Sequence, residues 1–297
     1  MKPEEEHGMK MVLGRDDLAA AAETAVRATG TDLERLDVRP VHKASRGFVN
    51  DTDVDLCELA VVTLLQAVAH GKPVVLLPVT TLGRHQHQTL VTCGELTLAD
   101  IEGSTVGVRS WSQTTGVWVR GFLSEQYGVD LRNVDWVVYE DGHVGEHEDP
   151  AWVKRAPEGA RLQTDFLEGR LDFGIMGNEL PADDRIRTAI PDASDVAQQW
   201  ALTKGFAPVN HVIGVTASAA CAHSAALCAA YDAMRAALPP TSPVDFSPVG
   251  FDALRGPVAQ AAQFALEQGV LPRPVPFDEL VEGSCAALGV EPARLGG

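Results

Sequence analysis

The 297-residue sequence has little positive charge: 24 lysines and arginines stand against 41 aspartates and glutamates, a net charge of −17. Such a chain repels phosphate backbones, so nucleic acid is not an expected partner. Long apolar runs are also missing, and none reaches the length of a bilayer span, so no membrane partner is expected. The remaining composition, 45% hydrophobic and 22% charged residues, is that of an ordinary globular protein.

A secretory signal is missing from the amino terminus. Residues 4–6 are three consecutive glutamates where a signal carries positive charge, and no apolar core of sufficient length follows them. We therefore expect the protein to be cytoplasmic.

The cysteines are odd in number and include no C-x-x-C pair. In a cytoplasmic chain this pattern predicts buried, reduced thiols and argues against a disulfide framework or a zinc site. Two of them, Cys221 and Cys228, lie seven residues apart, which predicts one shared face of a single helix. The others are Cys57, Cys93 and Cys285.

Several cofactor and catalytic motifs are absent. No G-x-G-x-x-G follows an expected strand, and the glycines and lysine of a P-loop are missing. No G-x-S-x-G is present, which argues against a Ser-His-Asp hydrolase. The sequence therefore predicts no organic cofactor.

Expected strands alternate with expected helices along the whole chain, which predicts a parallel or mixed α/β sheet. A strand over 10–13 precedes a helix that begins near Asp16 and is closed by Gly30. The apolar run 73–79 predicts a strand buried on both faces. Further strands are expected at 106–108, 136–139, 173–176 and 211–215. Helices are expected at 59–70, 115–126 and 161–168, in an alanine-rich segment after 211–215, and twice near the carboxyl terminus.

The chain is expected to pass twice between two lobes. The points of passage are placed at 96–103 and 209–215. They predict a discontinuous first lobe of residues 1–95 and 212–297 and a second lobe of residues 96–211. The predicted fold is therefore two α/β lobes with a ligand cleft between them.

Polar residues follow the buried strand 73–79. Arg84 and His85 lie there, and α/β proteins bind ligands at the carboxyl ends of such strands. An anion-binding arginine beside a histidine acid is one interpretation, and a plain surface loop is an equally good one. If the segment is extended, His87 points the same way as His85.

A second polar segment joins the strand 106–108 to the helix over 115–126. The N–H groups and dipole of a helix start bind carboxylate or phosphate, and hydroxyl side chains add donors. One hydroxyl is enough to cap the helix, and this segment has several beside an arginine. Its candidate binding residues are Arg109, Ser110, Trp111, Thr114 and Thr115.

The acidic segment 140–149 also contains His143 and His147. Imidazole and carboxylate suit a divalent metal ion. In so acidic a chain a solvated loop is the more frequent outcome, so no metal site is predicted.

Two junctions complete the candidate residues. Asn210 and His211 begin a strand at the second passage between lobes. Glu58 lies where a strand meets the helix expected over 59–70. It is either a buried acid facing the cleft or a first-turn carboxylate favoured by the helix dipole.

Taken together, these segments resemble the 4,5-dihydroxyphthalate decarboxylase family, whose fold is that of the type II periplasmic binding proteins. Their order and spacing hold from about Lys10 to Leu280, and the stretch 118–130 is the most specific part. The resemblance is carried by residues 55–59, 84–85, 106–108, 114–121, 127–130, 140–144, 210–212 and 267–269.

The resemblance implies non-oxidative loss of CO2 from a small hydroxylated aromatic carboxylate. Such an enzyme needs an acid near the carboxylated ring carbon, a partner for the phenolic oxygen and donors for the carboxylates. The predicted acid is His85 or His211, since imidazole titrates near neutral pH, and Glu58 is the predicted acceptor of a hydroxyl proton. The predicted substrate-binding residues are Arg84, Arg109, Ser110, Trp111, Thr114, Thr115 and Asn210. No organic cofactor is required, and the sequence leaves open whether the chains form a homo-oligomer.

Three other functions stay open at this level. A solute-binding protein of the same fold captures a small carboxylate anion in the same cleft, although the missing signal argues against it. A lyase that eliminates water from a cyclic acid is a second alternative. The third is a metal-dependent decarboxylase using His85, His87, His143 or His147.

Overall fold

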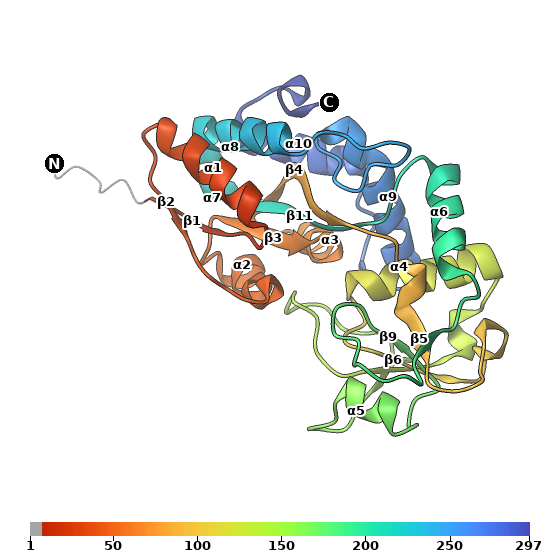
Figure 1. The fold of residues 1–297 in the computed structure, drawn as a ribbon. Helices are drawn as coiled ribbons and strands as arrows, with labels where there is room; N and C mark the ends of the chain where they lie inside the picture. Colours follow the sequence, from red (N-terminus) through yellow and green to blue (C-terminus); the bar gives the residue numbers. More distant parts are fainter. Residues whose placement is uncertain (1–7) are drawn as a thin grey trace.

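Two β-sheets organise the chain (Figure 1). The computed structural model describes residues 8–297. Residues 1–7, with which the predicted first lobe begins, lie outside this described part.

The first sheet has the strand order β2-β1-β3-β11-β4. Its strands are β1 (Met9–Val12), β2 (Leu33–Arg35), β3 (Leu56–Ala60), β4 (Val74–Gly83) and β11 (Val209–Thr216). β1 is parallel to both of its neighbours, whereas β11 runs antiparallel between β3 and β4. Helices cover both faces, which explains why β4 is a nearly continuous apolar run.

Helices cover the two faces of the first sheet as separate groups (Figure 1). In α1 the buried residues Leu18, Ala22 and Val26 recur at helical spacing, and the chain turns away at Gly30 with φ +85°. One face carries α1 (Asp16–Ala28), α7 (Ala217–Ala222), α8 (Ser224–Ala237) and α10 (Phe277–Leu288). The other carries α2 (Ser45–Asp51) and α3 (Val61–Ala69), and α9 (Phe251–Glu267) packs against α3.

The second sheet has the order β10-β5-β9-β6-β7-β8, with β6, β7, β8 and β9 parallel. Its strands are β5 (Leu90–Thr92), β6 (Thr105–Val108), β7 (Asp135–Val138), β8 (Lys154–Arg155), β9 (Phe173–Ile175) and β10 (Arg187–Thr188). The associated helices are α4 (Thr114–Tyr127), α5 (Leu162–Leu167) and α6 (Ala193–Lys204). Gly107 of β6 faces Leu162 of α5, and its neighbour Val108 faces Gly116 of α4, so these helices lie on opposite faces.

Helix α4 also packs against elements outside the second sheet. The Trp118 ring lies edge-on to Phe264 of α9 and Trp200 of α6, with centroids 5.8 and 5.9 Å apart. Gly121 permits this approach, because a Cβ there would lie 2.1 Å from Phe264. Short 3-10 turns complete the described chain: η1 (Val41–Ala44), η2 (His87–Thr89), η3 (Leu98–Asp100), η4 (Leu131–Asn133) and η5 (Pro292–Leu295).

The chain leaves the first sheet earlier than expected. β4 continues to Gly83, and β5 already pairs within the second sheet, so the passage lies over residues 84–89 instead of 96–103. The chain re-enters the first sheet at Val209. The division into lobes at 95/96 and 211/212 stays a prediction. The strands that belong to each sheet favour boundaries a few residues earlier at both points.

The prediction of a helix over 59–70 is wrong at its start. Residues 56–60 pair with β11, so Glu58 lies in a strand and α3 begins only at Val61. The alternative of Glu58 as a first-turn helical carboxylate is therefore wrong, and its burial is that of a residue inside the sheet.

The predictions for the cysteines are also corrected. The alanine-rich segment forms two helices that meet at His223, whose φ of −123° is not helical, so Cys221 and Cys228 do not share one helix. Cys221 is exposed, and Cys93 and Cys285 are partly exposed. Among residues 8–297, no helix has both the length and the apolar character needed to cross a bilayer.

Candidate active site

A cavity of about 470 Å³ lies between the two sheets. It is bounded by segments at the ends of β4, β6, β7 and β9, by the start of α4 and by β11. Seven of the ten predicted site residues line it: Arg84, Arg109, Ser110, Thr114, Thr115, Asn210 and His211.

Asn210 and His211 are neighbours in β11, and yet both line the cavity. Successive residues of a regular strand point to opposite faces. The pairing of β11 with β4 shifts register between Val209 and Val212, so the strand is irregular here. A bulge of this kind re-aims side chains, which explains how both residues reach the same space.

His211 is paired with Glu58 of the adjacent strand. Its Nδ1 lies 2.7 Å from Glu58 Oε1. An ionised carboxylate only accepts, so Nδ1 carries the proton and Nε2 is the ring nitrogen left for the cavity. Glu58 itself is buried behind His211 and lines an adjoining cavity instead of this one, so its direct contact with a substrate stays a prediction.

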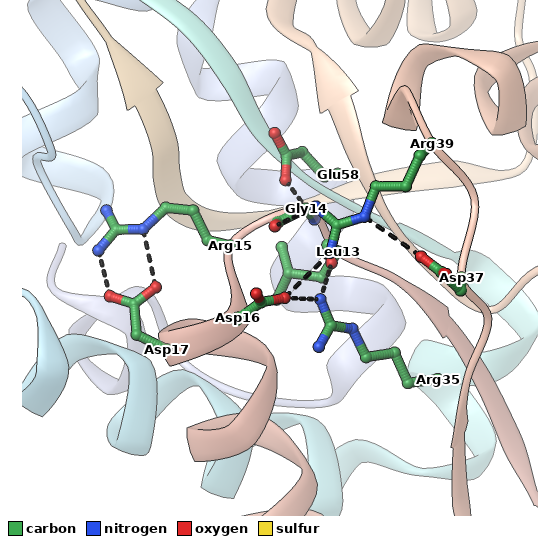
Figure 2. A network of polar contacts seen from close by, with 9 residues as sticks. All are labelled: Leu13, Gly14, Arg15, Asp16, Asp17, Arg35, Asp37, Arg39 and Glu58. Carbon is green, nitrogen blue, oxygen red and sulfur yellow. Dashed lines mark hydrogen bonds and ion pairs between the residues drawn. The ribbon is translucent and has the colours of Figure 1, made fainter.

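The turn after β1 holds the Glu58 carboxylate from its other side (Figure 2). The Gly14 N–H donates to Glu58 Oε2 over 2.8 Å. The carbonyl of the same peptide unit, that of Leu13, accepts from Arg35 Nη2 at 2.8 Å, and the Gly14 carbonyl accepts from Arg39 Nη1 at 3.1 Å. Two guanidinium groups thus fix the peptides that orient the carboxylate.

Gly14 leaves just enough room for this contact. A Cβ at this position would lie 2.8 Å from Val41 Cγ1 and 3.1 Å from Glu58 Oε2. Burial raises the pKa of Glu58, but the hydrogen bond and positive charge of His211, with bonds from Gly14 and Thr81, hold it below the ordinary value.

A first polar group of the lining surrounds Arg84. Its Nη1 donates to Asn178 Oδ1 over 2.7 Å, and its Nη2 lies 3.5 Å from Thr115 Oγ1. Asn210 Nδ2 approaches the same hydroxyl at 3.4 Å. We call Arg84, Thr115, Asn178 and Asn210 the arginine-amide group.

The start of α4 opens into the cavity beside this group. Gln113, the residue before the helix, makes no capping bond with its side chain, which instead donates to Glu179 Oε1 over 3.2 Å. The Thr114 hydroxyl accepts from the Val62 N–H at 3.3 Å. The first backbone N–H groups of α4 are therefore left for an anion, which the helix dipole also favours.

A second polar group of the lining contains Arg109, His42, His143 and Thr63. Arg109 Nη1 lies 3.2 Å from His42 Nε2, and since a guanidinium only donates, this imidazole nitrogen accepts. His143 Nδ1 lies 3.0 Å from the Thr63 hydroxyl, and the two imidazole rings stack with centroids 6.4 Å apart. We call these four residues the imidazole group.

The histidines of the imidazole group are held neutral. Burial lowers the pKa of His143 to about 4, and the positive charges of Arg109 and Arg46 add to the effect. Burial and Arg109 also lower the pKa of His42.

His143 reaches the cavity because the loop after β7 is fastened to α2. Arg46 Nη2 donates to the Gly142 carbonyl over 2.8 Å, and Asn50 Nδ2 donates to the His143 carbonyl over 2.9 Å. With the bond to Thr63, these contacts join the second lobe to the first.

Two predicted site residues lie elsewhere. The His85 ring packs edge-on against Phe246, with centroids 5.0 Å apart, and does not line the cavity. Trp111 is fully buried: its Nε1 donates to the Gln268 carbonyl, and Arg120 lies 3.6 Å above its ring. His85 turns away where the chain leaves β4, and Trp111 fills the core beneath α4.

The sequence analysis missed His42, Thr63, Asn178 and Glu179. Asn178 and Glu179 follow β9 closely, so the strand-end argument that selected Arg109 could have found them. Neither His42, in a 3-10 turn, nor Thr63, inside an apolar helix, carries a local signal of this kind.

The histidines considered for a metal ion are dispersed. His87 is stacked on Phe122, His143 belongs to the imidazole group, and His147 lies 3.3 Å from Asp149. Within residues 8–297, no three His, Cys, Asp or Glu side chains are grouped closely enough to hold a metal ion.

Sequence comparison finds two curated relatives. The chain is 26% identical over 185 residues to a 4,5-dihydroxyphthalate decarboxylase from Comamonas testosteroni, a match that spans 55% of this chain and 54% of that protein. It is 30% identical over 141 residues to a protein of the same name from Pseudomonas putida, over 44% of this chain and 54% of that protein. The predicted resemblance is confirmed.

The chain spans about half the length of the curated relatives it matches. No model of a known protein family matches the chain.

Solved structures with little sequence identity share the fold. A periplasmic sulfonate-binding protein, SsuA, from Methylobacillus flagellatus KT superposes with a TM-score of 0.53 at 11% identity, over 97% of this chain and 96% of that chain. A zinc-bound ligand-binding component of an ABC-type import system from Staphylococcus aureus gives 0.50 at 9% identity, over 94% and 84%. The predicted two-lobed fold of the periplasmic binding proteins is therefore confirmed.

Proposed function

We propose that this protein is a non-oxidative decarboxylase of a hydroxylated aromatic dicarboxylic acid such as 4,5-dihydroxyphthalate. The names of its two curated relatives support this function. The chemistry of the residues that line the cavity supports it independently.

The reaction has defined requirements. Direct loss of CO2 would leave an aryl carbanion with no group to accept its charge. Protonation of the ring carbon that bears the carboxylate, assisted by an ortho or para hydroxyl, avoids this carbanion. CO2 then leaves and the ring becomes aromatic again. An enzyme therefore needs a positioned acid and donors for the carboxylates.

The residues of the cavity fit these roles. Arg84, Asn210 and the open start of α4 bind the carboxylates, with hydroxyl donors from Ser110 and Thr115. Arg84 Nε is buried without a hydrogen-bond acceptor among residues 8–297, so it retains a donor. His211 Nε2 delivers the proton to the ring carbon, and Glu58 is its positioning residue.

The buried Glu58–His211 pair is the observation that carries the proposal. Capture of a carboxylate needs only positive charge and N–H donors. A histidine that bears an ordered carboxylate on Nδ1 and faces the ligand with Nε2 is instead the arrangement of a proton donor.

Release of CO2 from the purified chain tests this proposal. We expect 4,5-dihydroxyphthalate to yield CO2 and a dihydroxybenzoate, with the change in its ultraviolet band that decarboxylation causes. Phthalate, which lacks the hydroxyl groups, should bind without turnover. Binding of both compounds without CO2 release would refute the enzyme function.

The alternative is a solute-binding protein that captures a small carboxylate anion. The fold shared with periplasmic binding proteins favours this second function. It predicts tight binding of the anion without turnover. Replacing His211 should then leave the bound ligand chemically unchanged, as in the parent chain.

A further inference from the structure

We propose that the imidazole group binds the ring hydroxyl of the substrate and that His143 accepts its proton. This inference rests on the proposed decarboxylase function and deepens it. The cavity then distinguishes the two kinds of polar group on the ligand, with carboxylates at the arginine-amide group and hydroxyls at the imidazole group.

The two groups of the lining are chemically different. The arginine-amide group offers N–H donors and one full positive charge. The imidazole group has one guanidinium, that of Arg109, and also contains imidazole nitrogens that can accept a hydrogen bond. No hydrogen bond between residues 8–297 joins the two groups. A substrate with adjacent carboxylates on one edge of its ring and adjacent hydroxyls on the opposite edge matches this division.

The orientation of His143 suits a proton acceptor. In the tautomer that carries its proton on Nδ1, this nitrogen donates to the Thr63 hydroxyl 3.0 Å away, and the lone pair is on Nε2. The ring is held by this bond, and the backbone carbonyl of His143 accepts from Asn50 at 2.9 Å. Nε2 makes no hydrogen bond within residues 8–297, which leaves it for a ligand in the cavity that the residue lines.

Burial and the surrounding charges keep His143 unprotonated before a ligand binds. Burial lowers its pKa most, and Arg109, the stacked His42, Arg46 and His211 lower it further. A dianionic substrate offsets part of this positive charge and makes His143 a stronger base when the hydroxyl arrives. Arg109 then stabilises the phenolate oxygen that forms.

Glu58 is less suited to this role, because it does not line this cavity and its oxygens already accept from His211 Nδ1 and Gly14 N–H. The contacts of the two histidines differ: His211 Nδ1 meets the Glu58 carboxylate, whereas His143 lies near Arg109 and Arg46. Such opposed environments are typical of an acid and a base in one site.

The proton transfers balance. The phenolic O–H bond breaks, and its proton moves to His143 Nε2 while the oxygen pushes electrons into the ring. His211 Nε2 gives its proton to the carboxylated carbon. The bond to the carboxylate then breaks and CO2 leaves, with its electrons returning through the ring to the oxygen. The oxygen recovers its proton from His143, and water reprotonates His211.

Ligand selectivity is the direct test. Affinities for 4,5-dihydroxyphthalate and phthalate are measured by calorimetry in a His211→Asn background, which prevents turnover. We expect the background to prefer the hydroxylated acid by about tenfold, the worth of one good hydrogen bond. Adding His143→Ala should abolish the preference and change phthalate affinity by less than about twofold. Adding His85→Ala, the matched control outside the cavity, should leave both affinities unchanged.

A second variant separates binding from proton transfer. Glutamine reaches as far as Nε2 and keeps a hydrogen bond but accepts no proton. With His211 intact, His143→Gln should keep the KM for 4,5-dihydroxyphthalate within about threefold of the parent value and lose about a hundredfold in kcat.

Equal loss of affinity for both acids in His143→Ala would overturn the inference, and so would an unchanged preference. If the parent chain turns over 4,5-dihydroxyphthalate and His143→Ala leaves the preference unchanged, the inference is wrong and the proposed function stands. Failure of the parent chain to bind either acid overturns it together with the proposed function.

Discussion

His87 and His143 both have a pKa lowered to about 4 by burial, but His87 is packed against an aromatic ring and His143 lines the cavity. His87 is stacked on Phe122 with ring centroids 4.0 Å apart, and its Nε2 meets Gln126 at 2.8 Å inside the core. His143 lines a cavity, with one nitrogen unoccupied by any described residue. The difference teaches that a perturbed histidine indicates a site only when an open space meets its free nitrogen.

Replacing the cavity histidine that has a carboxylate partner should have the largest effect. We expect His211→Asn to lower the rate of CO2 release about a thousandfold, because the ring carbon loses its proton donor. His85→Asn, in the segment outside the cavity, should stay within about twofold of the parent rate. Equal losses of CO2 release in the two variants would contradict the assignment of His211, and not His85, to the active cavity.

Removing the arginine of the arginine-amide group should weaken binding. We expect Arg84→Met to raise KM about a hundredfold, since a charge-assisted bond to a carboxylate contributes about 1.5–3 kcal/mol. Arg255→Met removes a surface arginine paired with Asp278 and serves as the control. Steady-state kinetics on 4,5-dihydroxyphthalate measure both variants, and unchanged KM in the first would contradict the role of Arg84.

Crowding the Glu58 carboxylate should give a smaller, selective effect. In Gly14→Ala the new methyl group meets Val41 and Glu58, so we expect kcat to fall about tenfold with KM nearly constant, an order-of-magnitude figure for a misplaced acid. Gly94→Ala adds a methyl group to open space and is the matched control. A rise in KM together with the fall in kcat would indicate general distortion instead.

The core histidine should affect stability and leave activity intact. Between pH 6.5 and pH 4 the unfolded chain binds a proton at His87 that the folded chain refuses, so the free energy of unfolding falls as the pH drops. The loss reaches about 3 kcal/mol at this one residue.

Urea unfolding of His87→Gln at pH 7 and pH 4.5 checks this. The variant should lose less stability on acidification than the parent and should retain full turnover at pH 7. An identical pH dependence in both proteins would show that His87 does not titrate as described.

The sequence predicted the alternation of strands and helices and the strand ends that carry Arg84, Arg109 and His211. These features are local, since apolar runs and the polar residues after them are visible in the chain itself. The sequence could not choose between His85 and His211 as the proposed acid, because the two look alike until Glu58 is placed beside one of them. That placement depends on the pairing of β3 with β11, strands some 150 residues apart.

The imidazole group was hidden for a similar reason. His42, Thr63 and His143 come from three separate segments, and two of the three have no polar pattern around them. The irregular register of β11, which brings Asn210 and His211 to one face, also arises from pairing between distant strands. Contacts made by the fold, and not by neighbouring residues, complete this site.

The loop after β7 is tied to the other lobe at several points: by Arg46 and Asn50 of α2, by Thr63 of α3, and by an ion pair from Lys72 to Glu146 at 2.5 Å. Movement of this loop away from α2 and α3 breaks these bonds as a set. The same few contacts thus hold the backbone and the ring of His143 against the cavity, so the position of its side chain depends on how firmly the loop is attached to the other lobe.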